Sequence, residues 1–212
     1  MMLGNLTEKE VQVAEKLLKY GLAKGTLALE MVVQSPVVMK QLDLTLPSVK
    51  GVPQYSNKTE PKSYLLKTEL VGDLKGFCHL IFSDEDVAKI QGKCLPASLV
   101  EENNSQSRLM KMEFMTELDN MVAGAVVTEL ANYLELEMYG NVPALNVINS
   151  EEVNEYIDKE AIEMDANHAV RGIMHIPELN VFGEFVWLFQ DRIVELVQNF
   201  SKTEKANDIV EL

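Results

Sequence analysis

The 212-residue sequence predicts an α+β fold, a duplicated α-β unit with pseudo-twofold symmetry in which an antiparallel sheet carries two long helices. Two observations predict this fold. The first is that a long helical pattern, a strand and a hairpin occur in that order in each half of the chain. The second is a residue pattern that recurs with an offset of 107. Asp73-x-x-Gly76, Phe82, Asp84 and Val87 correspond to Asn180-x-x-Gly183, Phe189, Asp191 and Val194.

The first half opens with a capping-box pattern. Thr7 is suited to the N-cap position and Glu10 follows three residues later, so a helix is expected from here to about Val33. Ser35-Pro36 ends it. Leu42, Leu44 and Leu46 alternate with polar residues and predict a half-buried strand, and 49–62 is expected to be a surface loop. A hairpin over 64–82 and a short helix to about Gly92, capped by Ser83 or Asp84, complete this half.

The second half repeats this order of elements. A long helix is expected from about Arg108 to Asn132, and the alternation from Leu134 to Met138 predicts a strand directly after it. A helix near 151–159, a hairpin formed by 169–176 and 181–189, and a closing helix to about Phe200 follow. We therefore expect one domain over 1–212. Its pseudo-repeats span about 7–100 and 101–200, and a flexible tail occupies 201–212.

Charge narrows the classes of partner. The formal net charge is −14, and a surface this negative repels phosphate backbones and anionic lipid, so neither nucleic acid nor membrane is expected as a partner. The sequence shows no apolar run of membrane-spanning length and no signal-peptide pattern, which predicts a cytoplasmic protein with Cys78 and Cys94 reduced. His79, His168 and His175 lack the spacing of metal ligands, so no metal site is expected.

One face of the second long helix has an unusual composition. At about 100° per residue, a carboxylate pair, a carboxamide and then small residues share one stripe, formed by Glu113, Glu117, Asn120, Gly124, Thr128 and Ala131. Met115, Leu118, Val122, Val126 and Tyr133 lie broadly opposite and are expected in the core. A flat stripe of small residues lets another protein approach closely, so that Glu117 and Asn120 reach into it. The alternative is that both are ordinary solvated residues.

The same segment resembles the signature helix of the CheC/CheX/FliY family of chemotaxis phosphatases. The family pattern is Asp or Ser, three residues, Glu, two residues, Asn, then twenty-two residues and Pro. Glu117, Asn120 and Pro143 fit this spacing, while Glu113 replaces the Asp or Ser. Aligning Gly25 with Gly124 places Leu18 and Gly21 at the two motif positions of the first long helix, which predicts one intact site as in CheX, on a chain of CheC-like length.

The resemblance implies a response-regulator phosphatase of two-component signalling. Asn120 would position the water that attacks the aspartyl phosphate of a CheY-type regulator, and Glu117 would anchor the regulator's lysine. Glu113, Gly124 and Thr128 would contact the partner. The chain needs no cofactor of its own, because the regulator supplies Mg²⁺. The alternative is a non-catalytic module that binds a response regulator, CheD or the flagellar switch, and a homodimer is a further possibility that the resemblance raises.

Overall fold

The structure is a computed structural model that describes residues 6–45 and 60–211, and its first half follows the predicted order. Helix α1 (Glu8–Val33) is followed by β1 (Val38–Thr45), and the hairpin of β2 (Lys62–Gly72) and β3 (Gly76–Ser83) leads into α2 (Asp84–Cys94). The capping box between Thr7 and Glu10 is confirmed, and Ser83 caps α2. Most of the loop predicted at 49–62 lies outside the described residues.

The second half contains elements beyond those that the sequence pattern predicts. After the short α3 (Ala97–Glu101), helix α4 (Ser105–Leu134) leads to β4 (Met138–Gly140) and β5 (Ala144–Asn149). A 3-10 turn, η2 (Ser150–Glu152), precedes α5 (Val153–Glu163). The hairpin of β6 (His168–Ile176) and β7 (Val181–Phe189) confirms the second predicted hairpin, and α6 (Arg192–Phe200) and α7 (Glu204–Glu211) close the chain.

All paired strands are antiparallel and form one seven-stranded sheet, which confirms the predicted fold class. The order is β1-β6-β7-β3-β2-β4, and β5 also pairs with β2. The two hairpins therefore meet in the middle, where β3 pairs with β7, and each is flanked by a strand from the other half of the chain. His79 faces Val186 across this central pair, and these two positions differ by the offset of 107. The strand order is therefore symmetric about the central β3–β7 pair.

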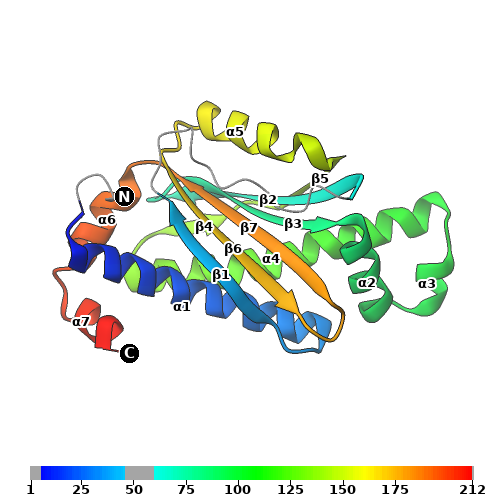
Figure 1. Cartoon of the computed structure of the whole chain (residues 1–212), viewed down its shortest axis with the longest axis horizontal. Coiled ribbons are helices and arrows are strands. Elements are labelled where there is room, and N and C mark those ends of the chain that lie inside the picture. Colours follow the sequence, from blue (N-terminus) through cyan, green and yellow to red (C-terminus); the bar gives the residue numbers. More distant parts are fainter. Residues whose placement is uncertain (1–5, 46–59, 212) are drawn as a thin grey trace.

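Helices cover both faces of the sheet (Figure 1), and the apolar clusters beneath them differ in size. On one face, α1 and α4 pack side by side and cover the main core, which includes Leu17, Leu66, Val126 and Phe189. On the other face, α5 covers a smaller cluster centred on Leu65, Ile81 and Ile157. Within the described residues, no helix combines the length and apolar character that a membrane span requires.

Two predicted elements differ from the structure. The strand predicted from Leu134 to Met138 is wrong, because α4 continues to Leu134 and Glu135 caps it in the left-handed conformation at φ 54°. The strand begins only at Met138, where pairing with β2 starts. The flexible tail predicted for 201–212 also differs, since α7 buries Ala206 and Ile209 against the main core. The sequence signal for α7 is weak because these two buried apolar residues lie in a mostly polar segment.

Candidate functional site

Helix α4 presents the candidate site because its two faces differ sharply. Asn104 begins the helix, with its side-chain oxygen 2.8 Å from the backbone nitrogen of Ser107, which donates the capping hydrogen bond. The expected inward residues Met115, Leu118, Val122 and Val126 are all buried, and they pack against the sheet and α1; Tyr133 is half-buried. This anchoring leaves the opposite stripe of the helix outside the core.

Five of the six stripe residues predicted from the sequence are exposed, and the sixth, Ala131, is half-buried against the main core. Glu113, Glu117, Asn120, Gly124 and Thr128 all lie at the surface. None of their side chains makes a hydrogen bond or ion pair with another described residue, so the carboxylates and the carboxamide are available to a partner. A Cβ built at Gly124 would meet no atom within 4 Å. The middle of the stripe is therefore open, and backbone of another protein can approach it.

The remaining motif position has a different environment. Pro143 is buried in the connection between β4 and β5, and β4 and β5 both pair with β2. Its ring is therefore enclosed, in contrast to the exposed residues of the stripe. Of the six predicted site residues, the structure thus exposes five along α4 and buries the sixth, Pro143.

Asp119 is a buried carboxyl directly beneath this surface. It is 1% exposed and accepts a hydrogen bond from the Thr68 hydroxyl of β2 at 2.8 Å. Burial raises the pKa of Asp119 to about 7, although the bond from Thr68 acts in the opposite direction. Burial, followed by the charge of Asp119, also raises the pKa of the neighbouring Cys78 thiol. The sequence pattern placed Asp119 only at the margin of the apolar side.

The structure corrects the alignment of the two long helices. Gly25 is buried against Val126, whereas its proposed counterpart Gly124 is exposed, so these two glycines are not equivalent. The helices instead correspond through their left-handed C-caps, Gln34 and Glu135, which lie 101 positions apart. With this offset, all eight buried positions of α4 from Met115 to Leu130 fall on buried positions of α1 between Ala14 and Leu29.

The corrected alignment changes which residues stand at the motif positions of α1. Lys16 corresponds to Glu117, and Lys19 corresponds to Asn120. A lysine ammonium donates hydrogen bonds but accepts none, so neither position retains the chemistry of its counterpart. The prediction of a single intact motif therefore stays. The residues at the two motif positions of α1 are Lys16 and Lys19 in place of Leu18 and Gly21.

A second group of ionisable side chains lies on the opposite face of the sheet. Glu160 of α5 forms an ion pair with Lys67, and its other carboxylate oxygen lies 2.9 Å from His79 Nε2. Burial opposes ionisation of Glu160, but His79 and Lys67 outweigh it and lower its pKa. Burial and the charge of Glu160 raise the pKa of Tyr156 to about 12. His79 is 1% exposed and Lys67 is half-buried, and the group links β2 and β3 of the sheet to α5.

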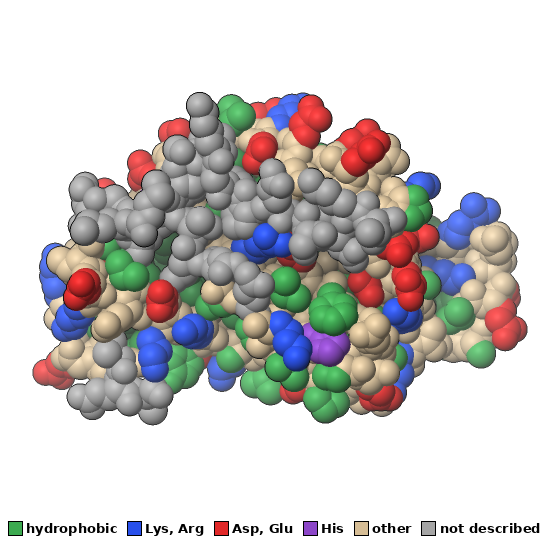
Figure 2. All heavy atoms as spheres, in the orientation of Figure 1, with side chains coloured by type: hydrophobic (Ala, Val, Ile, Leu, Met, Phe, Trp, Pro, Cys, Tyr) green, Lys and Arg blue, Asp and Glu red, His purple; other side chains and the backbone are tan. Residues whose placement is uncertain are grey.

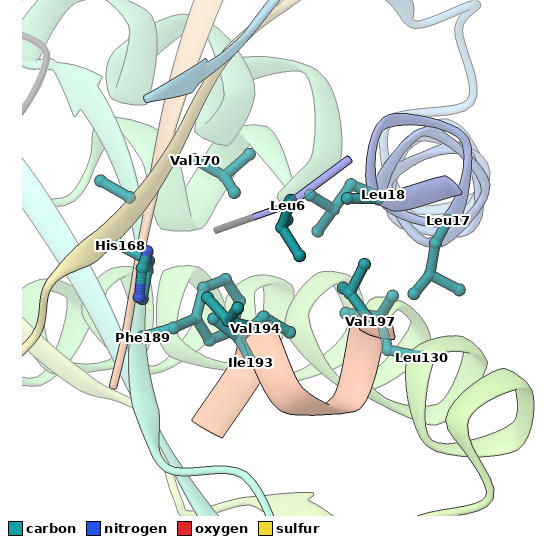
Figure 3. Close-up of a pocket in the computed structure, with 12 residues that line it drawn as sticks. Leu6, Leu17, Leu18, Leu130, His168, Val170, Phe189, Ile193, Val194 and Val197 are labelled. Carbon is teal, nitrogen blue, oxygen red and sulfur yellow. The ribbon is translucent and has the colours of Figure 1, made fainter. Parts of the chain in front are cut away.

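A small apolar cavity lies where α1, α6 and the β6–β7 pair meet (Figure 3). Its volume is about 40 Å³, and Leu17, Leu130, Phe189 and Val197 are among the residues that line it. The one ionisable lining side chain is His168, whose Nε2 lies 2.9 Å from Asp191 Oδ1. Since none of the five exposed stripe residues of α4 lines this cavity, it is separate from the candidate site.

Comparison with known proteins identifies the fold. No family model matches the sequence, and no curated protein matches it at a significant level. Among solved structures, FliY from Thermotoga maritima has a TM-score of 0.63 at 16% identity, covering 93% of this chain and 98% of that one. A chain from the CheX–CheY–BeF3–Mg²⁺ complex of Borrelia burgdorferi has a TM-score of 0.54 at 17% identity, covering 82% and 97%.

The same fold also occurs in a flagellar-switch protein. The middle domain of FliM from Vibrio alginolyticus has a TM-score of 0.51 at 11% identity, covering 89% of this chain and 99% of that domain. The chain therefore has the fold of the CheX and FliY chemotaxis proteins, as the sequence resemblance implied, and the FliM middle domain shares this fold. At these identities the comparison identifies the fold, and the chemistry has to be argued from the residues of this chain.

Proposed function

We propose that this protein is a phosphatase that hydrolyses the aspartyl phosphate of a CheY-type response regulator. The observation that carries the proposal is the exposed pair Glu117 and Asn120, one turn apart on α4, with no partner among the described residues and with the open position Gly124 beside it. The fold adds support, since one similar structure contains CheX together with CheY, BeF3 and Mg²⁺.

Hydrolysis of an aspartyl phosphate needs a water molecule in line with the leaving oxygen and neutralisation of the phosphoryl charge. Asn120 would enter the regulator's site and hold that water through its carboxamide, which both donates and accepts hydrogen bonds. Glu117 would pair with a lysine of the regulator. The regulator's own acidic cluster would bring Mg²⁺, which stabilises the phosphoryl oxygens, so this chain supplies position rather than metal chemistry.

The other three exposed residues would shape the contact. Gly124 would let the regulator's backbone approach α4, because any side chain there would stand between the two proteins. Glu113 and Thr128 would flank the pair at the two ends of the stripe. Glu113 keeps the negative charge of the Asp found at that position in the family pattern, but its side chain is one methylene longer and places the charge farther from the helix.

The first test is the decay of a phosphorylated regulator in the presence of Asn120→Ala. We expect the rate enhancement to fall roughly 100-fold while binding changes little, because a misplaced water affects the transition state more than the docked state. Asn132→Ala is the matched control, since Asn132 is also exposed on α4 but lies outside the stripe. Equal activity of Asn120→Ala and wild type would remove Asn120 from the mechanism.

The second test separates docking from stability at Gly124. Gly124→Ala should stabilise the fold by about 1 kcal/mol, because the site is an open helix interior, whereas Gly124→Gln should weaken regulator binding without loss of stability. Gly92→Ala and Gly92→Gln in α2 are the controls, since Gly92 also has open space at Cβ. Denaturant unfolding and titration with the regulator give the two readouts. If Gly124→Gln binds as wild type does, the stripe is not the docking surface.

A second candidate function is regulator binding without useful hydrolysis. It is favoured by the loss of the motif on α1 and by the likeness to the FliM middle domain. The two functions differ in one measurement, the decay rate of the phosphorylated regulator at saturating wild-type protein. Acceleration over the regulator's own decay supports the phosphatase, and binding with unchanged decay supports the binding module.

A further inference from the structure

The face of α1 that corresponds to the candidate site has the opposite charge. In place of Glu113, Glu117, Asn120, Gly124 and Thr128, α1 presents Gln12, Lys16, Lys19, Ala23 and Leu27. Lys16 is half-buried and the other four are exposed. Ala23 keeps a small side chain where α4 has Gly124, so the surface remains flat. The duplicated face has thus lost the acidic motif while keeping the shape that allows close approach.

This basic character stands out against the rest of the chain. The net charge is −14, from 33 acidic and 19 basic residues, yet Lys16, Lys19 and the nearby Lys40 of β1 pair with no carboxylate among the described residues. Glu15 flanks the row, and Lys24 extends it toward α4, where it reaches Glu129 at 4.0 Å. Figure 2 shows several Lys and Arg side chains over the region of α1, at the lower left of the view, with a few Asp and Glu side chains among them.

A hollow lies between this face and β1. Its volume is about 450 Å³, and its lining includes two lysines, Lys19 and Lys40, together with the apolar side chains of Met39 and Leu42. Farther along α1, Leu27 is 52% exposed and Met31 is 76% exposed. The surface therefore offers positive charge next to apolar contact area, and such a combination suits a ligand that carries both acidic and apolar side chains.

We propose that the α1 face, formed by Lys16, Lys19, Ala23, Leu27 and Lys40, binds an acidic amphipathic segment of a partner protein. Charge complementarity selects the acidic groups, and the hollow and Leu27 accept the apolar ones. A long polyanion such as duplex DNA, or an anionic membrane, extends beyond the patch and meets the negative remainder of the surface. A short protein segment contacts the basic face alone, so it is the occupant that the charge distribution favours.

The test uses a defined probe, a fluorescein-labelled 15-residue peptide with Glu and Leu at helical spacing, and follows fluorescence anisotropy at low and high salt. Wild type should bind, and salt should weaken the binding. Lys16→Glu/Lys19→Glu should weaken it at least tenfold. The matched control is Lys62→Glu/Lys159→Glu, which makes the same charge change at exposed lysines of β2 and α5. It should change the affinity less than threefold.

The proposal is overturned by no binding by wild type, by equal weakening by both double variants, or by binding of duplex DNA or anionic vesicles in place of the peptide. A peptide with Lys at every Glu position should bind at least tenfold more weakly, and equal binding would also count against it. The decay of a phosphorylated regulator should be the same for Lys16→Glu/Lys19→Glu and wild type. Failure of this proposal therefore leaves the proposed phosphatase function untouched.

Discussion

At the residue scale, Asp119 is the group whose position the apolar pattern of α4 does not explain. Its counterpart on α1, under the corrected alignment, is Leu18, which is also buried. The same packing position therefore holds an apolar side chain in one half and a carboxyl group in the other. A buried carboxyl is tolerated when it is neutral and hydrogen-bonded, and the hydroxyl of Thr68 meets the second condition.

The raised pKa of Asp119 predicts a specific dependence of stability on pH. In the folded protein Asp119 holds its proton until about pH 7, whereas in the unfolded chain it releases the proton near its ordinary value. The folded state therefore binds more protons between these values, and the free energy of unfolding falls as pH rises through this range. The full effect is at most about 4 kcal/mol, since each pKa unit corresponds to about 1.4 kcal/mol.

Asp119→Asn should remove this dependence. In urea unfolding, the stability of the variant relative to wild type should rise by a few kcal/mol between pH 4 and pH 8, because the wild-type loss begins near the ordinary pKa of the carboxyl and continues to about pH 7. The difference between the two proteins isolates Asp119, because the other titrating groups contribute equally to both. A difference that stays constant from pH 4 to pH 8 would contradict the raised pKa.

At the element scale, α5 tests how a helix is held on the far face of the sheet. It carries two ion pairs of opposite character, the buried Glu160 with Lys67 and the exposed Glu163 with Lys159. Glu160→Gln should cost about 3 kcal/mol, because it leaves Lys67 and His79 without the charge they surround. Glu163→Gln should cost less than about 0.5 kcal/mol. Thermal unfolding of both variants measures the contrast, and similar losses would show that the buried cluster does not hold α5.

The elements also show what the sequence could and could not predict. The hairpins were predictable because each has alternating apolar residues on both sides of a turn, and the motif stripe was predictable because its spacing is local to one helix. Strand β5 was missed, since at the edge of the sheet its side chains are only partly buried and it is held by backbone pairing with β2. The predicted alignment of α1 with α4 is wrong because it matches Gly25 with Gly124. The two helices correspond instead through their buried positions.

At the scale of the whole molecule, the two halves meet where α1 crosses α4. Gly25 and Val126 are equivalent under the corrected alignment, and they contact each other, as residues beside a pseudo-twofold axis must. A Cβ built at Gly25 would lie 2.6 Å from Val126 Cγ2. The valine is branched and stiff at χ1, so it cannot readily move aside. The close packing of the halves thus depends on a glycine facing a valine.

This contact predicts that a Gly→Ala substitution changes the stability of the fold in opposite directions in the two long helices. Gly25→Ala should lower stability by about 1–2 kcal/mol, since overpacking outweighs the gain in helix propensity, whereas Gly124→Ala should raise it. Val126→Ala alone should also destabilise, through a small cavity. The double variant Gly25→Ala/Val126→Ala should be more stable than the sum of its single changes by at least about 1 kcal/mol, which a double-mutant cycle in urea measures. Strict additivity would mean that the halves do not meet at this pair.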